Sequence, residues 1–76
     1  MKEVLEILAK SLVDNPDEVS VTEVEGERGT ILELRVADSD MGKVIGKQGR
    51  IAKAIRTVVK AAASRENKRA VVEIIG

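Results

Sequence analysis

Two glycines interrupt what would otherwise be one long amphipathic helix in the second half of the chain. The loop Gly46-Lys47-Gln48-Gly49 (the glycine loop) separates a short segment, residues 41–45, from a longer one that begins near Arg50. Glycine is a poor helix former and readily takes positive φ, so this pair predicts a tight turn between two helices. Because glycine has no Cβ, the backbone N–H groups of this turn can approach a ligand closely, and phosphate oxygens are suitable acceptors for them.

The segments on either side of the glycine loop have the features of two helices, and the longer one has an apolar side and a basic side. Residues 38–40 (Asp-Ser-Asp) offer oxygens that we expect to cap the short helix. On a wheel of the longer helix, apolar residues share an arc of about 100°, which predicts the core face. These residues are Ile51, Ile55, Val58, Val59 and Ala62. The opposite side carries a basic stripe that leads away from the loop: Lys53, Arg56 and Lys60, with Arg50 at its margin.

The remaining segments predict one helix and three strands. Apolar residues recur at helical spacing from Lys2 to Val13, and Pro16 forces an end before Asn15. Residues 18–25 and 30–37 are rich in β-branched residues and predict a hairpin, with a bulge or a ragged strand end where the apolar parity shifts between Val21 and Val24. Residues 69–75 predict the last strand. The order predicts an α+β fold with helices on one face of a three-stranded sheet. The strands before and after the helical pair are parallel if adjacent.

Composition limits the chemistry of this chain. With 76 residues we expect a single domain over residues 1–76. It has no Cys and no His, which excludes thiol nucleophiles, imidazole acid–base catalysis and common zinc sites, and we expect no cofactor or metal. An enzyme could still use Asp38 and Asp40 as paired carboxylates, but we rank capping above catalysis and do not expect an enzyme. The absence of Cys, of a signal peptide and of a membrane span predicts a cytoplasmic protein.

The net charge of zero hides two halves of opposite sign. Residues 1–40 hold 4 Lys/Arg and 11 Asp/Glu, whereas residues 41–76 hold 9 and 2. The basic half can therefore attract a polyanion while the acidic half faces away, although two ordinary solvated faces would give the same counts.

The segment Val44-Ile45-Gly46-Lys47-Gln48-Gly49-Arg50 resembles the V-I-G-x-x-G signature of the KH domain, and the element order resembles its type II arrangement, α-β-β-α-α-β. The resemblance covers the whole chain and is close to the KhpA family of small bacterial stand-alone KH proteins, especially over residues 40–50 and 54–62. One departure is Ala52, where the extended signature has a larger apolar residue.

The resemblance implies a cytosolic protein that binds single-stranded RNA, with the glycine loop clamping the backbone of about four nucleotides. It implies an RNA chaperone or post-transcriptional regulator, with a second copy or a larger KH-containing protein as a candidate partner. The predicted RNA-binding residues are Val44, Ile45, Gly46, Lys47, Gln48, Gly49, Arg50, Lys53 and Arg56. The alternative is a protein-interaction module that acts mainly through such pairing. Since the chain has no aromatic residue, bases cannot stack on Phe, Tyr or Trp, and low sequence specificity is expected.

Overall fold

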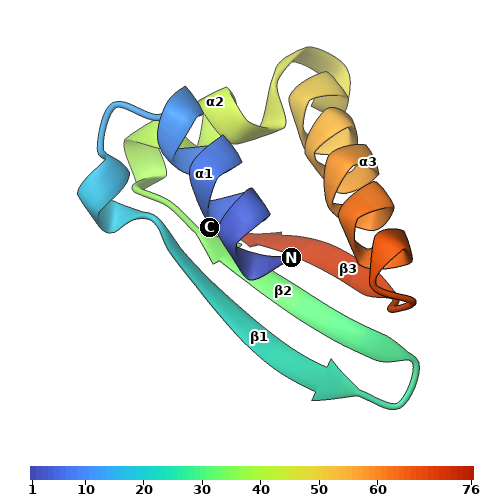
Figure 1. Ribbon diagram of the computed structural model, residues 1–76. Helices are drawn as coiled ribbons and strands as arrows, with labels where there is room; N and C mark the ends of the chain where they lie inside the picture. Colours follow the sequence, from blue (N-terminus) through green and yellow to red (C-terminus); the bar gives the residue numbers. More distant parts are fainter.

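Three helices cover one face of a three-stranded sheet in the computed structural model, which describes residues 1–76 (Figure 1). The predicted α+β fold and the order expected of a type II KH domain are confirmed. Short 3-10 turns lie at Pro16–Glu18, Asp38–Asp40 and Lys47–Gly49. The main elements are α1 (Lys2–Leu12), β1 (Ser20–Gly26), β2 (Gly29–Arg35), α2 (Met41–Ile45), α3 (Arg50–Arg65) and β3 (Ala70–Ile75).

The sheet has the order β1-β2-β3, with β2 in the centre. β1 and β2 are antiparallel and joined by a two-residue turn, whereas β2 and β3 are parallel. Parallel neighbours need a crossover connection, and α2, the glycine loop and α3 supply it. β2 and β3 are adjacent, so the parallel pairing expected in that case is confirmed. The glycine loop lies within the crossover, between α2 and α3 (Figure 1).

The irregularity predicted in the first strand, a bulge or a ragged strand end, is wrong. The register runs without interruption from Ser20 opposite Arg35 to Gly26 opposite Gly29. The shift in hydrophobic parity has a simpler cause: Val21 faces the helices and is buried, while Val24 lies on the open face of the sheet and is 41% exposed. An apolar residue on an open sheet face is common in soluble proteins and needs no backbone irregularity.

The core lies between the sheet and the helices. Its fully buried side chains come from the centre of the sheet, Leu32 and Leu34, and from the helices above, including Leu5 and Val44. Buried residues alternate with less buried ones along β2. In α1 two apolar positions of the predicted helical pattern are exposed: Ile7 is 66% exposed and Leu12 is 38% exposed. No helix of the structure has both the length and the apolarity needed to cross a membrane.

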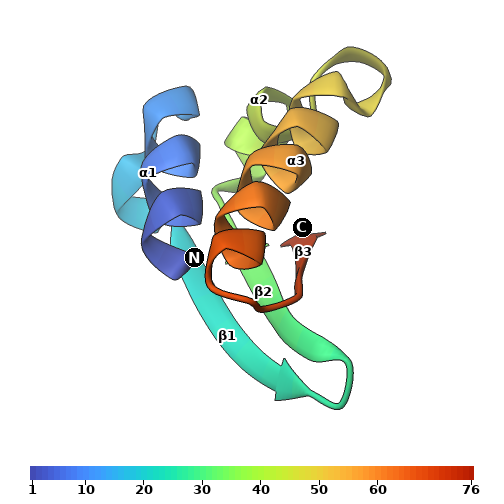
Figure 2. The same cartoon turned by 45° about the vertical axis from the view of Figure 1, so that its right-hand side comes forward.

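The core face of α3 differs from the predicted arc. Its buried residues are Ala52, Ile55, Val59 and Ala63. Val58 is instead 45% exposed, and Ala62 is only partly buried. The face is rotated toward the two alanines because small side chains let the helix approach the sheet closely, whereas the sequence pattern gives most weight to bulky residues. Figure 2 shows the resulting layer, with α1 and α3 side by side over the strands.

Candidate nucleic-acid interface

The glycine loop has an unusual backbone. Gly46 has φ 75° and ψ 173°, Gln48 has φ 57° and Gly49 has φ 72°. The Gly46 N–H donates to the Gly42 carbonyl at 2.9 Å and the Gly49 N–H donates to the Gly46 carbonyl at 3.2 Å. Lys47 and Gln48 are the first two residues of the turn Lys47–Gly49, and the first N–H groups of a helical turn have no acceptor within it. Two adjacent amides at an exposed turn are therefore free to bind an anion.

The two glycines have different surroundings. A Cβ on Gly46 would lie 2.6 Å from Cγ1 of Ile51 and 2.9 Å from its Cδ1, so Ile51 closes over this position. A Cβ on Gly49 would meet nothing within 4 Å. Gly46 is consequently required by packing as well as by its φ, whereas Gly49 leaves an open approach to the backbone of the loop.

The predicted site residues do not all reach the surface. Lys47, Gln48 and Arg50 are exposed, and Ile45 is 37% exposed beside the loop. Val44 has no exposed surface and belongs to the core. We therefore leave Val44 out of the contact surface, because a side chain without exposed atoms supports the interface only from below.

The basic stripe continues from the loop along α3. Lys53 and Arg56 are exposed, and the Arg56 Nε donates to the Val72 carbonyl of β3 at 3.3 Å. None of the cations at Lys47, Arg50, Lys53 and Arg56 forms an ion pair in the structure. Their charge is not neutralised within the protein, so this side of α3 presents a positive field to an approaching anion.

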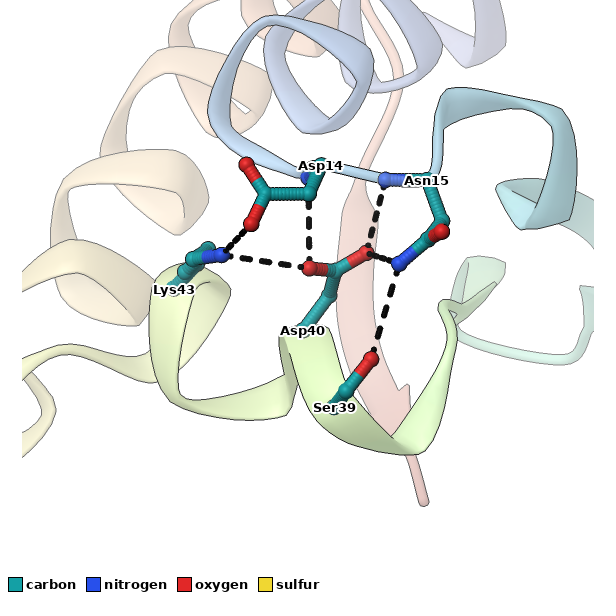
Figure 3. Close-up of polar contacts among 5 residues, drawn as sticks. All are labelled: Asp14, Asn15, Ser39, Asp40 and Lys43. Atoms are coloured by element: carbon teal, nitrogen blue, oxygen red, sulfur yellow. Dashed lines mark hydrogen bonds and ion pairs between the residues drawn. The ribbon is translucent and has the colours of Figure 1, made fainter.

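A buried carboxylate ties the start of α2 to the segment that follows α1 (Figure 3). Asp40 is 1% exposed. Its Oδ1 accepts from the Asp14 N–H at 3.2 Å, and its Oδ2 accepts from the N–H and the side-chain amide of Asn15, both at 3.0 Å. The predicted capping role of residues 38–40 is wrong, because neither the turn nor α2 has a side-chain cap. Asp40 instead ties the end of α1 to the start of α2, a long-range contact that spacing along the chain does not reveal.

The electrostatics of this cluster keep it ionised. Burial by itself would raise the pKa of the Asp40 carboxyl, but the Asn15 side chain, the two backbone N–H groups and the Lys43 ammonium together lower that pKa below its usual value of 3.8. The hydrogen bond to Asp14 raises the pKa of Lys43 above 10.5, against the effect of burial, and Asp40 adds to the rise. Because its oxygens are occupied by protein donors, Asp40 is not placed to act as a catalytic carboxylate, and the cluster is a structural tether.

Comparisons with known proteins agree with this geometry. The family model described as "KhpA/KhpB, KH domain" matches residues 2–74. A protein of Clostridium acetobutylicum named "RNA-binding protein KhpA" is 76% identical over 75 residues, covering 99% of this chain and 100% of its own. Proteins of the same name from Clostridium perfringens and Aquifex aeolicus are 73% and 53% identical, covering 99% of this chain and 100% and 95% of their own lengths. This chain therefore belongs to the KhpA/KhpB family of KH-domain proteins.

Proposed function

We propose that residues 1–76 act as one KH unit that binds single-stranded RNA through the glycine loop and the adjoining side of α3, without enzymatic activity. The observation that carries this proposal is the exposed turn at Lys47 and Gln48, whose first N–H groups have no acceptor within the turn, beside an open Gly49. The names of the family's relatives support the same ligand.

The site suits a nucleic-acid backbone better than a rigid small ligand. The free amides of the loop would donate to one phosphate, and the exposed cations of Lys47, Arg50, Lys53 and Arg56 would neutralise this phosphate and its neighbours. Ile45 supplies an apolar surface at the edge of the loop on which a base can rest. Contacts to the backbone outnumber contacts that could distinguish bases, so we expect weak sequence preference.

The absence of aromatic residues shapes the affinity. Stacking on aromatic side chains contributes about 1–3 kcal/mol per base in many single-strand binders, and this chain lacks that contribution. We therefore propose that a second KH unit, either another copy or a larger KH-containing protein, raises the affinity through simultaneous contacts with one RNA. The proposed place of action is the cytoplasm, and the proposed roles are those of an RNA chaperone or post-transcriptional regulator.

The test is a pair of acidic substitutions, Lys47→Asp with Gln48→Asp. Both side chains are exposed, and Asp tolerates the positive φ of residue 48 better than most residues do. Substituting the glycines would be less informative, because a side chain at Gly46 collides with Ile51. Two carboxylates beside the free amides should repel phosphate while the fold is retained.

Fluorescence anisotropy with a labelled single-stranded RNA provides the measurement, and far-UV circular dichroism confirms folding. Wild-type affinity should fall with salt along a log–log slope of about −2 to −3, as expected for three or four phosphate contacts. The matched control is Lys2→Gln with Lys10→Asp, which lowers the net charge by the same amount on α1. Normal RNA binding by the folded loop variant would overturn the proposal and favour a module that acts mainly through protein pairing.

A further inference from the structure

The helix that leads directly into the glycine loop is too short to hold its own position. This helix, α2, has five residues, and no side chain caps its first amides. Isolated helices shorter than about 12–15 residues are marginal in water, so the orientation of α2 depends on contacts with the rest of the protein. The Gly46 N–H closes the last turn of α2 on the Gly42 carbonyl, so the start of the glycine loop follows the orientation that α2 takes.

Asp40 makes long-range hydrogen bonds in place of a local one. It stands at the N-cap position of α2, where an aspartate usually accepts a hydrogen bond from an amide of its own helix. Its buried carboxylate instead accepts three hydrogen bonds from Asp14 and Asn15, which lie 26 and 25 residues earlier in the chain. The side chain therefore fixes where α2 begins relative to the end of α1, rather than stabilising α2 from within.

A second side chain of α2 reaches the same segment. Lys43 lies about one turn further along the helix and forms ion pairs with Asp14 and with Asp40, whose Oδ1 is 3.5 Å from the ammonium (Figure 3). A single anchor would leave α2 free to swing about it. Two anchors about one turn apart also fix the direction of the helix, and the fully buried Val44 attaches it to the core.

The segment that receives these contacts is itself well ordered. The ring of Pro16 fixes the φ of that residue, which begins a 3-10 turn directly after Asn15. The Glu18 N–H donates to the Asn15 carbonyl at 3.0 Å, and the Val19 N–H donates to the Pro16 carbonyl at 3.1 Å. The donors to Asp40 thus come from a chain segment with few conformations of its own.

Every group that faces the Asp40 carboxylate is a donor. Oδ1 accepts from the Asp14 N–H and lies beside the Lys43 ammonium, while Oδ2 accepts from the N–H and the side-chain amide of Asn15. An asparagine at position 40 would have to turn its NH2 group, which cannot accept a hydrogen bond, toward one of these two sets of donors. Replacing the carboxylate by an amide of the same shape therefore breaks one of the two attachments.

We propose that Asp40 is a positioning residue for RNA binding: its contacts with residues 14 and 15 and with Lys43 fix the direction of α2 and thereby hold the amides of the glycine loop where a phosphate can bind. The inference rests on the proposed function and adds to it a residue that does not itself touch RNA. A loop that is held in its binding conformation avoids the cost of being ordered on binding. If it is not held, the affinity falls in proportion to the population of the binding-competent conformation.

The sign of the effect separates positioning from electrostatics. Asp40→Asn removes a negative charge, and this change alone should strengthen the binding of a polyanion. The matched control, Asp14→Asn, removes the same charge from a neighbouring side chain that is 76% exposed, and keeps the hydrogen bond to Asp40 that the Asp14 backbone donates. Asp40→Asn should bind a labelled twelve-nucleotide single-stranded RNA at least about five-fold more weakly than Asp14→Asn, as expected when the competent conformation falls to about one fifth of the population.

Loss of stability must be separated from loss of geometry. Val21→Ala removes buried apolar atoms from β1, outside α2, the glycine loop and α3, and should destabilise the protein through its core. At a temperature at which circular dichroism shows all variants folded, Val21→Ala should bind RNA like the wild type. If Asp40→Asn does not fold, Asn15→Ala takes its place, because it removes only the side-chain donor to Oδ2 and should still weaken binding at least about two-fold.

Two further measurements report on the loop directly. NMR order parameters of the backbone at residues 46–49 should fall in the RNA-free Asp40→Asn variant, or in Asn15→Ala, and not in Val21→Ala. The salt dependence of RNA binding should keep its wild-type slope in Asp40→Asn, because no phosphate contact is removed. Unchanged order parameters in the weakened variant would overturn the inference.

The affinities give the remaining decisive outcomes. Equal RNA affinities of Asp40→Asn and Asp14→Asn, or an equal loss in Val21→Ala, would overturn the positioning role and leave the proposed function intact. Normal RNA binding by the folded loop variant, Lys47→Asp with Gln48→Asp, would instead remove the proposed function and with it the premise of this inference.

Discussion

Replacing Gly46 by alanine should destabilise the protein far more than the same change at Gly49, although the two residues belong to one motif. Gly46 combines φ 75° with ψ 173°, a region that is essentially restricted to glycine. Its Cβ would also lie 2.6 Å from Cγ1 and 3.0 Å from Cβ of Ile51. The branched Ile51 cannot withdraw simply by rotating its tip, because its own Cβ is one of the atoms in the collision.

The expected magnitudes follow from these two features. Backbone strain of this kind costs about 1–3 kcal/mol, and forcing an extra methyl group into a packed site costs about 1–3 kcal/mol more. The loss of flexibility in the unfolded chain returns only about 0.4–1 kcal/mol. Gly46→Ala should therefore lower the free energy of unfolding by about 2–5 kcal/mol. Gly49→Ala should lower it by about 1 kcal/mol, since Gly49 has the left-handed conformation but nothing within 4 Å of its Cβ position.

Urea unfolding followed by far-UV circular dichroism measures this difference. The method suits a chain without Trp or Tyr, whose intrinsic fluorescence offers no signal. A small domain has only about 3–5 kcal/mol of net stability, so we expect Gly46→Ala to leave a substantial unfolded population even without urea. Equal midpoints for the two variants, or a lower midpoint for Gly49→Ala, would refute the reasoning from Ile51.

Two further substitutions test the hydrogen bonds of Asp40 and the backbone conformation at the end of α3. Asp40→Asn should destabilise the protein at pH 7, because an amide replaces a carboxylate that accepts three hydrogen bonds. Folding lowers the pKa of Asp40. The carboxylate therefore contributes to the free energy of unfolding above the usual pKa of 3.8, and this contribution is lost as the pH falls through the pKa of the folded state. The wild type and Asp40→Asn should thus converge in stability below about pH 4, and a constant difference in urea midpoint from pH 7 to pH 2 would contradict this. Asn67→Ala should lower the melting temperature by about 4–8 °C, because alanine in the left-handed conformation costs about 1 kcal/mol more, whereas Asn67→Gly should not lower it; equal melting temperatures for the two variants would exclude this reasoning from the backbone conformation.

Local patterns along the chain predict most of the fold. The end of α1 before Pro16, the hairpin around the turn 26–29 and the interruption at Gly46 each depend on the intrinsic preferences of one or two residues. Such preferences act over a few positions, so the sequence alone reveals them. The parallel pairing of β2 and β3 follows because the helical pair between them is long enough for a crossover.

The rotation of α3 could not be predicted in the same way. A helical wheel orders residues by hydrophobicity, and Val58 outranks Ala52 on any such scale. The sheet below selects the side that packs most closely, and Ala52 and Ala63 permit that approach, with 4% and 1% of their surfaces exposed. The choice depends on the shape of the partner layer, which the segment itself does not contain.

The functional surface also depends in part on contacts between segments that are distant in the sequence. The basic stripe on α3 was predictable from spacing alone, because its residues share one helix. Arg28 is 28 residues before Arg56 in the chain, and only the contact of Gly29 with Arg69 brings the hairpin turn to the end of α3. Similarly, the sequence predicts that Asp40 caps a helix, whereas in the fold its Oδ2 accepts a hydrogen bond from the Asn15 side chain. Contacts between elements therefore determine both the role of Asp40 and the position of the hairpin turn.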